Sequence, residues 1–103
     1  MNLQDWANSV VTIETEKRRL SILQYLLKSS GYEAVAGLLR LHCIATGVPS
    51  TFDQILAAIQ WLEEQELITV RNHVNEPISR LTIDGREVAE GQRSVPGVLR
   101  PDP

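Results

Sequence analysis

The apolar residues between positions 50 and 91 change their spacing twice, and this change constrains the fold more than any other feature. From 50 to 66 they recur three and four apart, as on the buried face of a helix. From Leu67 the spacing falls to two, which predicts a half-buried hairpin over residues 67–82. Thr82 can then cap a short helix that Gly91 ends. The expected buried stripe of the long helix is Phe52, Ile55, Leu56, Ile59 and Leu62.

A first helix is predicted near the start of the chain. Leucines at 20, 23, 26 and 27, with Ile13 on the same face, indicate a helix over residues 11–29. The pattern leaves its start open as far back as Leu3 and Trp6.

A second helix is expected over residues 32–46. Ser30 and Glu33 have the spacing of a capping box, and Gly31 supplies a corner between two helices. The Gly-Val-Pro sequence at 47–49 breaks the helix, because proline disfavours helical geometry in the residue before it. The third helix can then be capped in two registers, Ser50 with Asp53 or Thr51 with Gln54.

Prolines shape the hairpin and the tail. Residues 72–76 form the expected turn, and Pro77 cannot donate a backbone hydrogen bond, so we expect it at the start of an edge strand over 78–81. After Gly91, the prolines and the glycine at 96, 97, 101 and 103 disfavour regular structure. They predict an extended arm over 92–103 that either frays or lies in a groove of another subunit.

Three helices followed by a hairpin and a short helix are typical of a winged helix-turn-helix. The sequence therefore predicts a mainly α-helical fold with a small β-hairpin: a three-helix core, a two-stranded wing, a short C-terminal helix and the extended arm. We expect the domain to cover residues 1–91 and the arm 92–103. A chain of 103 residues with 43% hydrophobic composition is sufficient for one compact domain.

Charge and cysteine content narrow the function classes. Ten basic and thirteen acidic residues give a net charge of −3, so nucleic-acid binding would need a local basic patch. The single cysteine, Cys43, cannot form an internal disulfide, which favours a reducing compartment.

The apolar runs fall far short of the roughly 20 residues of a membrane span, and no signal sequence opens the chain. We expect a cytoplasmic protein that does not bind a membrane.

Catalysis has little support in the sequence. His42 and His73 lie in different predicted elements, and neither has a carboxylate or nucleophile at a diagnostic spacing. His42 beside Cys43 falls short of the roughly four ligands of a zinc site. No glycine-rich phosphate loop with its lysine is present. We therefore predict no enzymatic activity, no metal and no cofactor.

The helix over 50–66 is the predicted reading helix of a DNA-binding domain. Its N-terminal half would enter the major groove, so the acids at 63, 64 and 66 would stand away from the bases and only Asp53 would lie close. The predicted base contacts are Thr51, Gln54 and Ala57, flanked by Ser50 and Ala58. The predicted phosphate contacts are Lys17, Arg18, Arg19, Arg40, Arg71 and Arg80.

A protein-binding or dimerisation module could use the same fold. Trp61 lies on the non-core face of the third helix and needs cover, either from the wing, which is the simpler expectation, or from a partner. The predicted interface residues are Trp6, Trp61, Val95, Val98 and Leu99.

Two resemblances extend these expectations. The stretch 61–68, followed by a hairpin and by Leu81-Thr82, Gly85-Arg86 and Val88-Ala89, resembles the helix–wing–helix segment of bacterial regulators of the ArsR and MarR type. Over nearly its whole length the chain is similar to small proteins of Mu-like transposable phages and prophages. The matching pieces are Arg18-Arg19-Leu20 with Ile22-Leu23, Gly31-Tyr32, Trp61-Leu62-Glu63-Glu64-Gln65, Leu81-Thr82, Val88-Ala89 with Gly91, and the distinctive tail Val95-Pro96-Gly97-Val98 with Arg100-Pro101.

The chain departs from the phage pattern at Glu66, where such proteins more often have glycine, and in its longer N-terminal segment. The resemblance implies a winged-helix phage protein in the cytoplasm of a bacterial host. From the fold and the candidate contact residues, the first function that we expect is DNA-binding transcriptional regulation, as a homodimer on duplex DNA. The alternative is a non-enzymatic interaction or packaging accessory that uses the fold to dimerise or to bind another phage or host protein.

Overall fold

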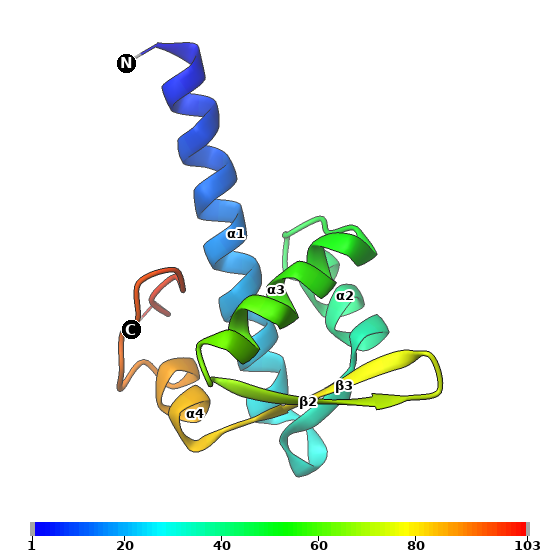
Figure 1. Ribbon diagram of the computed structural model, residues 1–103. Helices are drawn as coiled ribbons and strands as arrows, with labels where there is room; N and C mark the ends of the chain where they lie inside the picture. The colour runs from blue at the N-terminus through cyan, green and yellow to red at the C-terminus, as the bar shows by residue number, and fades with distance from the viewer. Residues whose placement is uncertain (1, 103) are drawn as a thin grey trace.

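The computed structural model describes residues 2–102, and these form four α-helices and one small antiparallel sheet (Figure 1). The ends of the predicted domain and arm, residues 1 and 103, lie outside that range. The elements are α1 (Leu3–Lys28), a 3-10 turn η1 (Ser30–Tyr32), β1 (Glu33–Val35), α2 (Ala36–Ala45), α3 (Phe52–Glu64), β2 (Ile68–His73), β3 (Glu76–Leu81) and α4 (Ile83–Ala89). This order is compatible with a winged-helix architecture. Over residues 2–102 no helix combines the length and apolar character that a membrane crossing needs.

Helix α1 is longer than predicted, and its two halves differ. It begins at Leu3, where the side chain of Asn2 accepts a hydrogen bond from the backbone N–H of Asp5 at 2.8 Å. Its buried residues begin only at Arg18. The first half extends away from the rest of the molecule (Figure 1), so Ile13, predicted on the core face, is 53% exposed.

The segment predicted to start the second helix forms a strand instead. Residues 33–35 pair with β3, and α2 begins only at Ala36. The predicted capping box at Ser30 and Glu33 is wrong, because Glu33 accepts two hydrogen bonds from Arg71 of β2, at 2.7 and 3.0 Å. A carboxylate paired with a guanidinium in this way makes stronger hydrogen bonds than a helix cap offers. The pairing also lowers the pKa of Glu33.

Helix α3 begins with the second of the two predicted caps. The backbone N–H of Gln54 donates to Oγ1 of Thr51 at 3.1 Å, and the N–H of Thr51 donates to Oε1 of Gln54 at 2.9 Å. Of the predicted buried stripe, Ile55, Ile59 and Leu62 lie in the core. Leu56 is half-buried and Phe52 is 40% exposed, because both lie at the edge of the stripe rather than at its centre.

The sheet has the order β1-β3-β2, so β3 is its central strand. The prediction of an edge strand beginning at Pro77 is therefore wrong. The ladder with β1 covers only Ile78, Ser79 and Arg80. Pro77 lies just beyond it, so the missing N–H breaks no bond to β1.

Gly85 allows α4 to pack closely on Leu67, in the turn between α3 and β2, and a larger residue there should destabilise the fold. A Cβ at this position would overlap the carbonyl oxygen of Leu67 and approach Cδ1 of Leu81 at 2.8 Å. The same carbonyl accepts a hydrogen bond from the N–H of Thr82 at 3.1 Å, which limits how far it can move. We expect Gly85→Ala to lower the free energy of unfolding by about 1–3 kcal/mol. Urea denaturation measures the change.

The matched control is Asp84→Ala, one residue earlier on α4. Its exposed ion pair with Arg93 is worth roughly 1 kcal/mol or less. Equal stabilities of Gly85→Ala and the unchanged chain would contradict the close packing of α4 on Leu67.

Candidate interaction surfaces

The predicted base-contact residues lie near the start of α3 and are exposed. Gln54 and Ala57 line a cleft of about 170 Å³ between α3 and α1, together with Arg18 and Arg19. Thr51 is the exposed N-cap of the same helix. The structure thus brings four predicted DNA-binding residues to one cleft.

The guanidinium of Arg18 is not available to bind a ligand in this cleft. Arg18 is only 4% exposed; its Nε donates to Oγ of Ser50 at 2.7 Å and its Nη2 donates to the carbonyl of Pro49 at 3.2 Å. Ser50 in turn donates to the carbonyl of Val48 at 2.9 Å. The Arg18 guanidinium therefore holds the turn between α2 and α3. Arg18 and Ser50 are both buried. The predictions that Arg18 contacts phosphate and that Ser50 faces the DNA groove are therefore wrong.

Arg19 packs on the ring of Trp61. Its guanidinium carbon is 3.9 Å from the centroid of the Trp61 ring, and its Nη1 donates to the carbonyl of Gly97 at 2.9 Å. Partial burial lowers the pKa of Arg19. Trp61 is therefore half-buried under Arg19 and the C-terminal arm, and the expectation that the wing covers it is wrong.

The C-terminal arm packs on its own chain. Val98 is buried, Val95 is half-buried, and the N–H of Leu99 donates to the carbonyl of Glu16 at 3.3 Å. The expectation that the arm frays or lies in the groove of another subunit is therefore wrong. Of the predicted interface residues, Leu99 keeps 36% and Trp6 keeps 59% of its surface exposed.

The remaining predicted phosphate contacts are spread over the molecule. Lys17, Arg40 and Arg80 are exposed and come from α1, α2 and β3. Arg71 is paired with Glu33, which raises the pKa of Arg71. Helix α3 itself contributes no Lys or Arg. Its exposed polar residues include Asp53, Gln60, Glu63 and Glu64.

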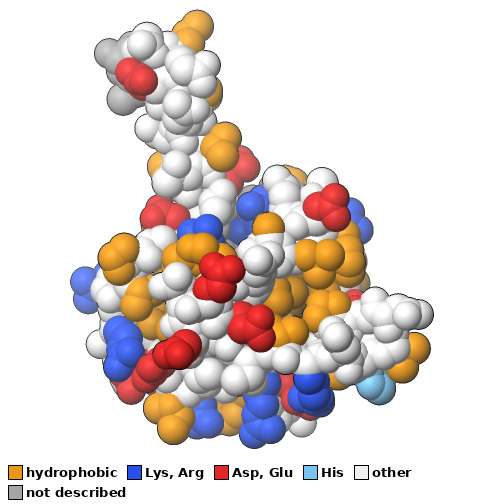
Figure 2. Space-filling model, viewed as in Figure 1, with side chains coloured by type: hydrophobic (Ala, Val, Ile, Leu, Met, Phe, Trp, Pro, Cys, Tyr) orange, Lys and Arg blue, Asp and Glu red, His pale blue; other side chains and the backbone are white. Residues whose placement is uncertain are grey.

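An apolar surface on α2 is the main feature that sequence reasoning missed. Leu38, Leu41 and Ile44 are 45%, 62% and 44% exposed, and they lie on the side of α2 opposite its buried residues. Phe52, at the start of α3, is also exposed. We call these four residues the α2 face. Figure 2 shows apolar side chains gathered over α2 and the adjoining side of α3. In the sequence, Leu38, Leu41 and Ile44 are three positions apart, and this spacing could have indicated a second apolar side of the helix.

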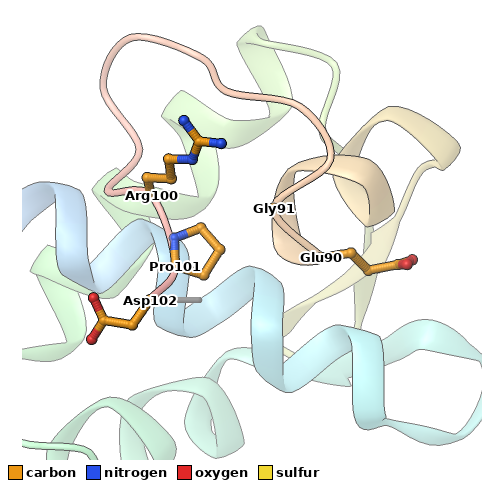
Figure 3. Close-up of a pocket in the computed structure, with 5 residues that line it drawn as sticks. All are labelled: Glu90, Gly91, Arg100, Pro101 and Asp102. Carbon is orange, nitrogen blue, oxygen red and sulfur yellow. The ribbon is translucent and has the colours of Figure 1, made fainter.

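The cleft beside α4 does not bring titratable side chains together. A cleft of about 520 Å³ lies between the end of α4 and the end of the arm (Figure 3), but the side chains of Glu90, Arg100 and Asp102 point away from one another. Burial raises the pKa of the Cys43 thiol to about 11, and a thiol in that state is a poor nucleophile. His42 packs against Tyr25, with ring centroids 4.9 Å apart, and burial lowers its pKa.

Within residues 2–102 no three His, Cys, Asp or Glu side chains come together as a metal site.

The contact between Gly97 and Trp61 should determine whether the arm stays docked. A Cβ at Gly97 would lie 2.5 Å from Cζ2 of Trp61, and the glycine has φ +98°. We expect Gly97→Ala to displace the arm, so that Trp61 fluorescence shifts to longer wavelength in a Trp6→Phe background and proteases cleave residues 92–102. Gly47→Ala is the matched control, since Gly47 has φ +88° with nothing near its Cβ position. Both variants bear the strain of a positive φ, but only Gly97→Ala should release the arm. Equal spectra for the two variants would contradict this contact.

Comparison with known proteins gives a relative of nearly the same length. The chain is 41% identical over 91 residues to the uncharacterized protein gp26 of Escherichia phage Mu, and the match covers 88% of this chain and 94% of the relative. No family model and no solved structure matches the chain. The match confirms the resemblance to proteins of Mu-like phages. The chain belongs to the family of phage Mu protein gp26.

Proposed function

We propose that this protein is a non-enzymatic winged-helix module that binds a protein partner through the α2 face. The observation that carries the proposal is the exposure of three large aliphatic side chains on one side of a single helix, Leu38, Leu41 and Ile44. Single exposed apolar residues are ordinary, whereas a contiguous patch with polar neighbours marks an interaction site.

The winged-helix part of the proposal is supported by topology. A strand between α1 and α2, and a hairpin after α3, form one sheet in which the third strand in the chain is central. The hairpin β2–β3 corresponds to the wing, and α2 and α3 correspond to the two helices of the helix-turn-helix. The structure adds a third strand, β1, to the predicted two-stranded wing.

The surface chemistry of α2 and α3 indicates the class of partner. In a helix-turn-helix bound to DNA, these two helices meet the duplex. Here α2 presents leucines and isoleucine, and its Arg40 donates from Nε to the carbonyl of Ser50 at 2.9 Å. Helix α3 presents Asp53, Glu63 and Glu64 and no cation. Such a surface repels phosphates, and it fits an apolar segment flanked by Lys or Arg. A phage or host protein with an amphipathic basic helix is the partner that this chemistry favours.

DNA-binding transcriptional regulation is the second candidate. Thr51, Gln54 and Ala57 are exposed at the N-terminal half of α3, and Lys17 and Arg40 are exposed on neighbouring helices. The acids of α3 and the internal use of Arg18 and Arg19 place this function below protein binding.

Site-specific photo-crosslinking tests the protein-binding function. A benzophenone side chain in place of Leu41 should give a discrete adduct with another protein during phage growth, and the same group at Thr69 of β2, also exposed, is the control. Once the adduct identifies the partner, Leu38→Glu should weaken its binding about 30-fold, since a charge at a buried anchor removes about 2 kcal/mol or more. Adducts at Leu41 that contain only this chain, or none, would contradict the proposal.

Fluorescence polarisation with random and phage duplexes tests the second candidate. We expect no binding tighter than roughly 10⁻⁴ M at physiological salt. Sub-micromolar binding that falls steeply with salt, and that Arg71→Glu with Arg80→Glu weakens, would instead support the DNA-binding function.

A further inference from the structure

The first half of α1 extends into solvent without support from the rest of the molecule. We call residues 3–14 the projecting helix; every one of them except Val10 is exposed. Figures 1 and 2 show this segment standing away from the globular part. Leu3 is 86% and Trp6 is 59% exposed.

The apolar residues of the projecting helix form a seam. Leu3, Trp6, Val10 and Ile13 are spaced three, four and three apart. This is the alternation that places one residue of each turn against a partner helix in a coiled coil. Ala7 and Ser9 flank the seam and are small and uncharged, so a second helix can approach closely.

The projecting helix is a continuation of the buried half of α1, but packing adds nothing to its stability. It needs no nucleus of its own, and its persistence therefore depends on helix propensity and on any surface that covers it. Residues 10–13, Val-Val-Thr-Ile, are all β-branched and lower the helix propensity. The helix is therefore best explained by a surface that covers its seam.

We propose that the projecting helix pairs antiparallel with the projecting helix of a second copy of this chain. The seam is self-complementary in that orientation, because Trp6 faces the smaller Val10 of the second copy and Leu3 faces Ile13. A parallel pair would instead place one Trp6 against the other. The two globular parts would then also lie at the same end of the pair, rather than at opposite ends.

The charges favour the same orientation. The projecting helix carries Asp5 and Glu14 and no Lys or Arg. In a parallel pair each Glu14 would lie on the same side of the interface as Glu16 of the other copy, so that like charges would face each other. In the antiparallel pair each Glu14 lies beside the first turn of the other helix, where free N–H groups carry partial positive charge.

Sedimentation equilibrium of the full chain tests the pairing. We expect a dimer, and we expect Trp6→Glu and Ile13→Glu to be monomers with an intact globular part. Val11→Glu is the matched control and should remain a dimer, because Val11 is 62% exposed on the same helix but lies outside the seam. A wild-type monomer at concentrations up to about 100 μM, or a Val11→Glu monomer, would overturn the proposal.

Disulfide trapping tests the orientation. Ile13→Cys alone should not link two chains, whereas Leu3→Cys combined with Ile13→Cys should, since a disulfide requires Cα atoms within about 7 Å. Cys43 is buried in the core beside Arg18 and takes no part. A linked Ile13→Cys dimer would overturn the antiparallel arrangement.

The pairing does not depend on the α2 face. Leu41→Glu should therefore remain a dimer even if it no longer binds the protein partner. A monomeric Leu41→Glu would assign the self-contact to the α2 face and overturn the pairing of the projecting helices.

Discussion

The burial of the second half of α1 is the constraint on which the rest of the structure depends. Ile22, Leu23 and Leu26 are completely buried, and this half of the helix contacts α2, α3, α4 and β3. One turn earlier in the helix, Arg18 donates hydrogen bonds to the turn between α2 and α3. The next residue, Arg19, packs on Trp61 and donates a hydrogen bond to the C-terminal arm. One stretch of helix therefore positions α3, supports the sheet and docks the C-terminus.

The contacts of α1 leave few of the predicted DNA-binding cations free on the surface. Two of the cations expected to contact DNA, Arg18 and Arg19, are used inside the fold, and a third, Arg71, is paired with Glu33. Apart from Arg40, the large side chains exposed on α2 are aliphatic, and α3 carries exposed acidic residues and no Lys or Arg. This distribution of side chains supports the proposal that the α2 face binds a protein. The projecting helix adds a second apolar surface, distant in the chain from the first.

Local patterns predicted the elements whose contacts are local. The Thr51–Gln54 cap, the buried Ile55, Ile59 and Leu62, the hairpin and the Thr82 cap of α4 all follow from spacing and side-chain chemistry. Strand β1 was not predictable in this way, because its three residues are ordered by pairing with β3, more than forty positions later. The capping signal at Glu33 was misleading for the same reason, since Arg71 lies 38 residues away. The cover of Trp61 by Gly97 depends on a comparable long-range contact.

Hydrogen exchange at two protein concentrations tests the central claim, that apolar contact with another chain holds the half of α1 that the core leaves exposed. At high concentration we expect slow exchange in both halves of α1. On dilution the amides of residues 7–14 should exchange quickly, while those of residues 20–28 stay protected by the core. Fast exchange of residues 7–14 at every concentration would contradict the account, because it would show that no second copy covers the projecting helix.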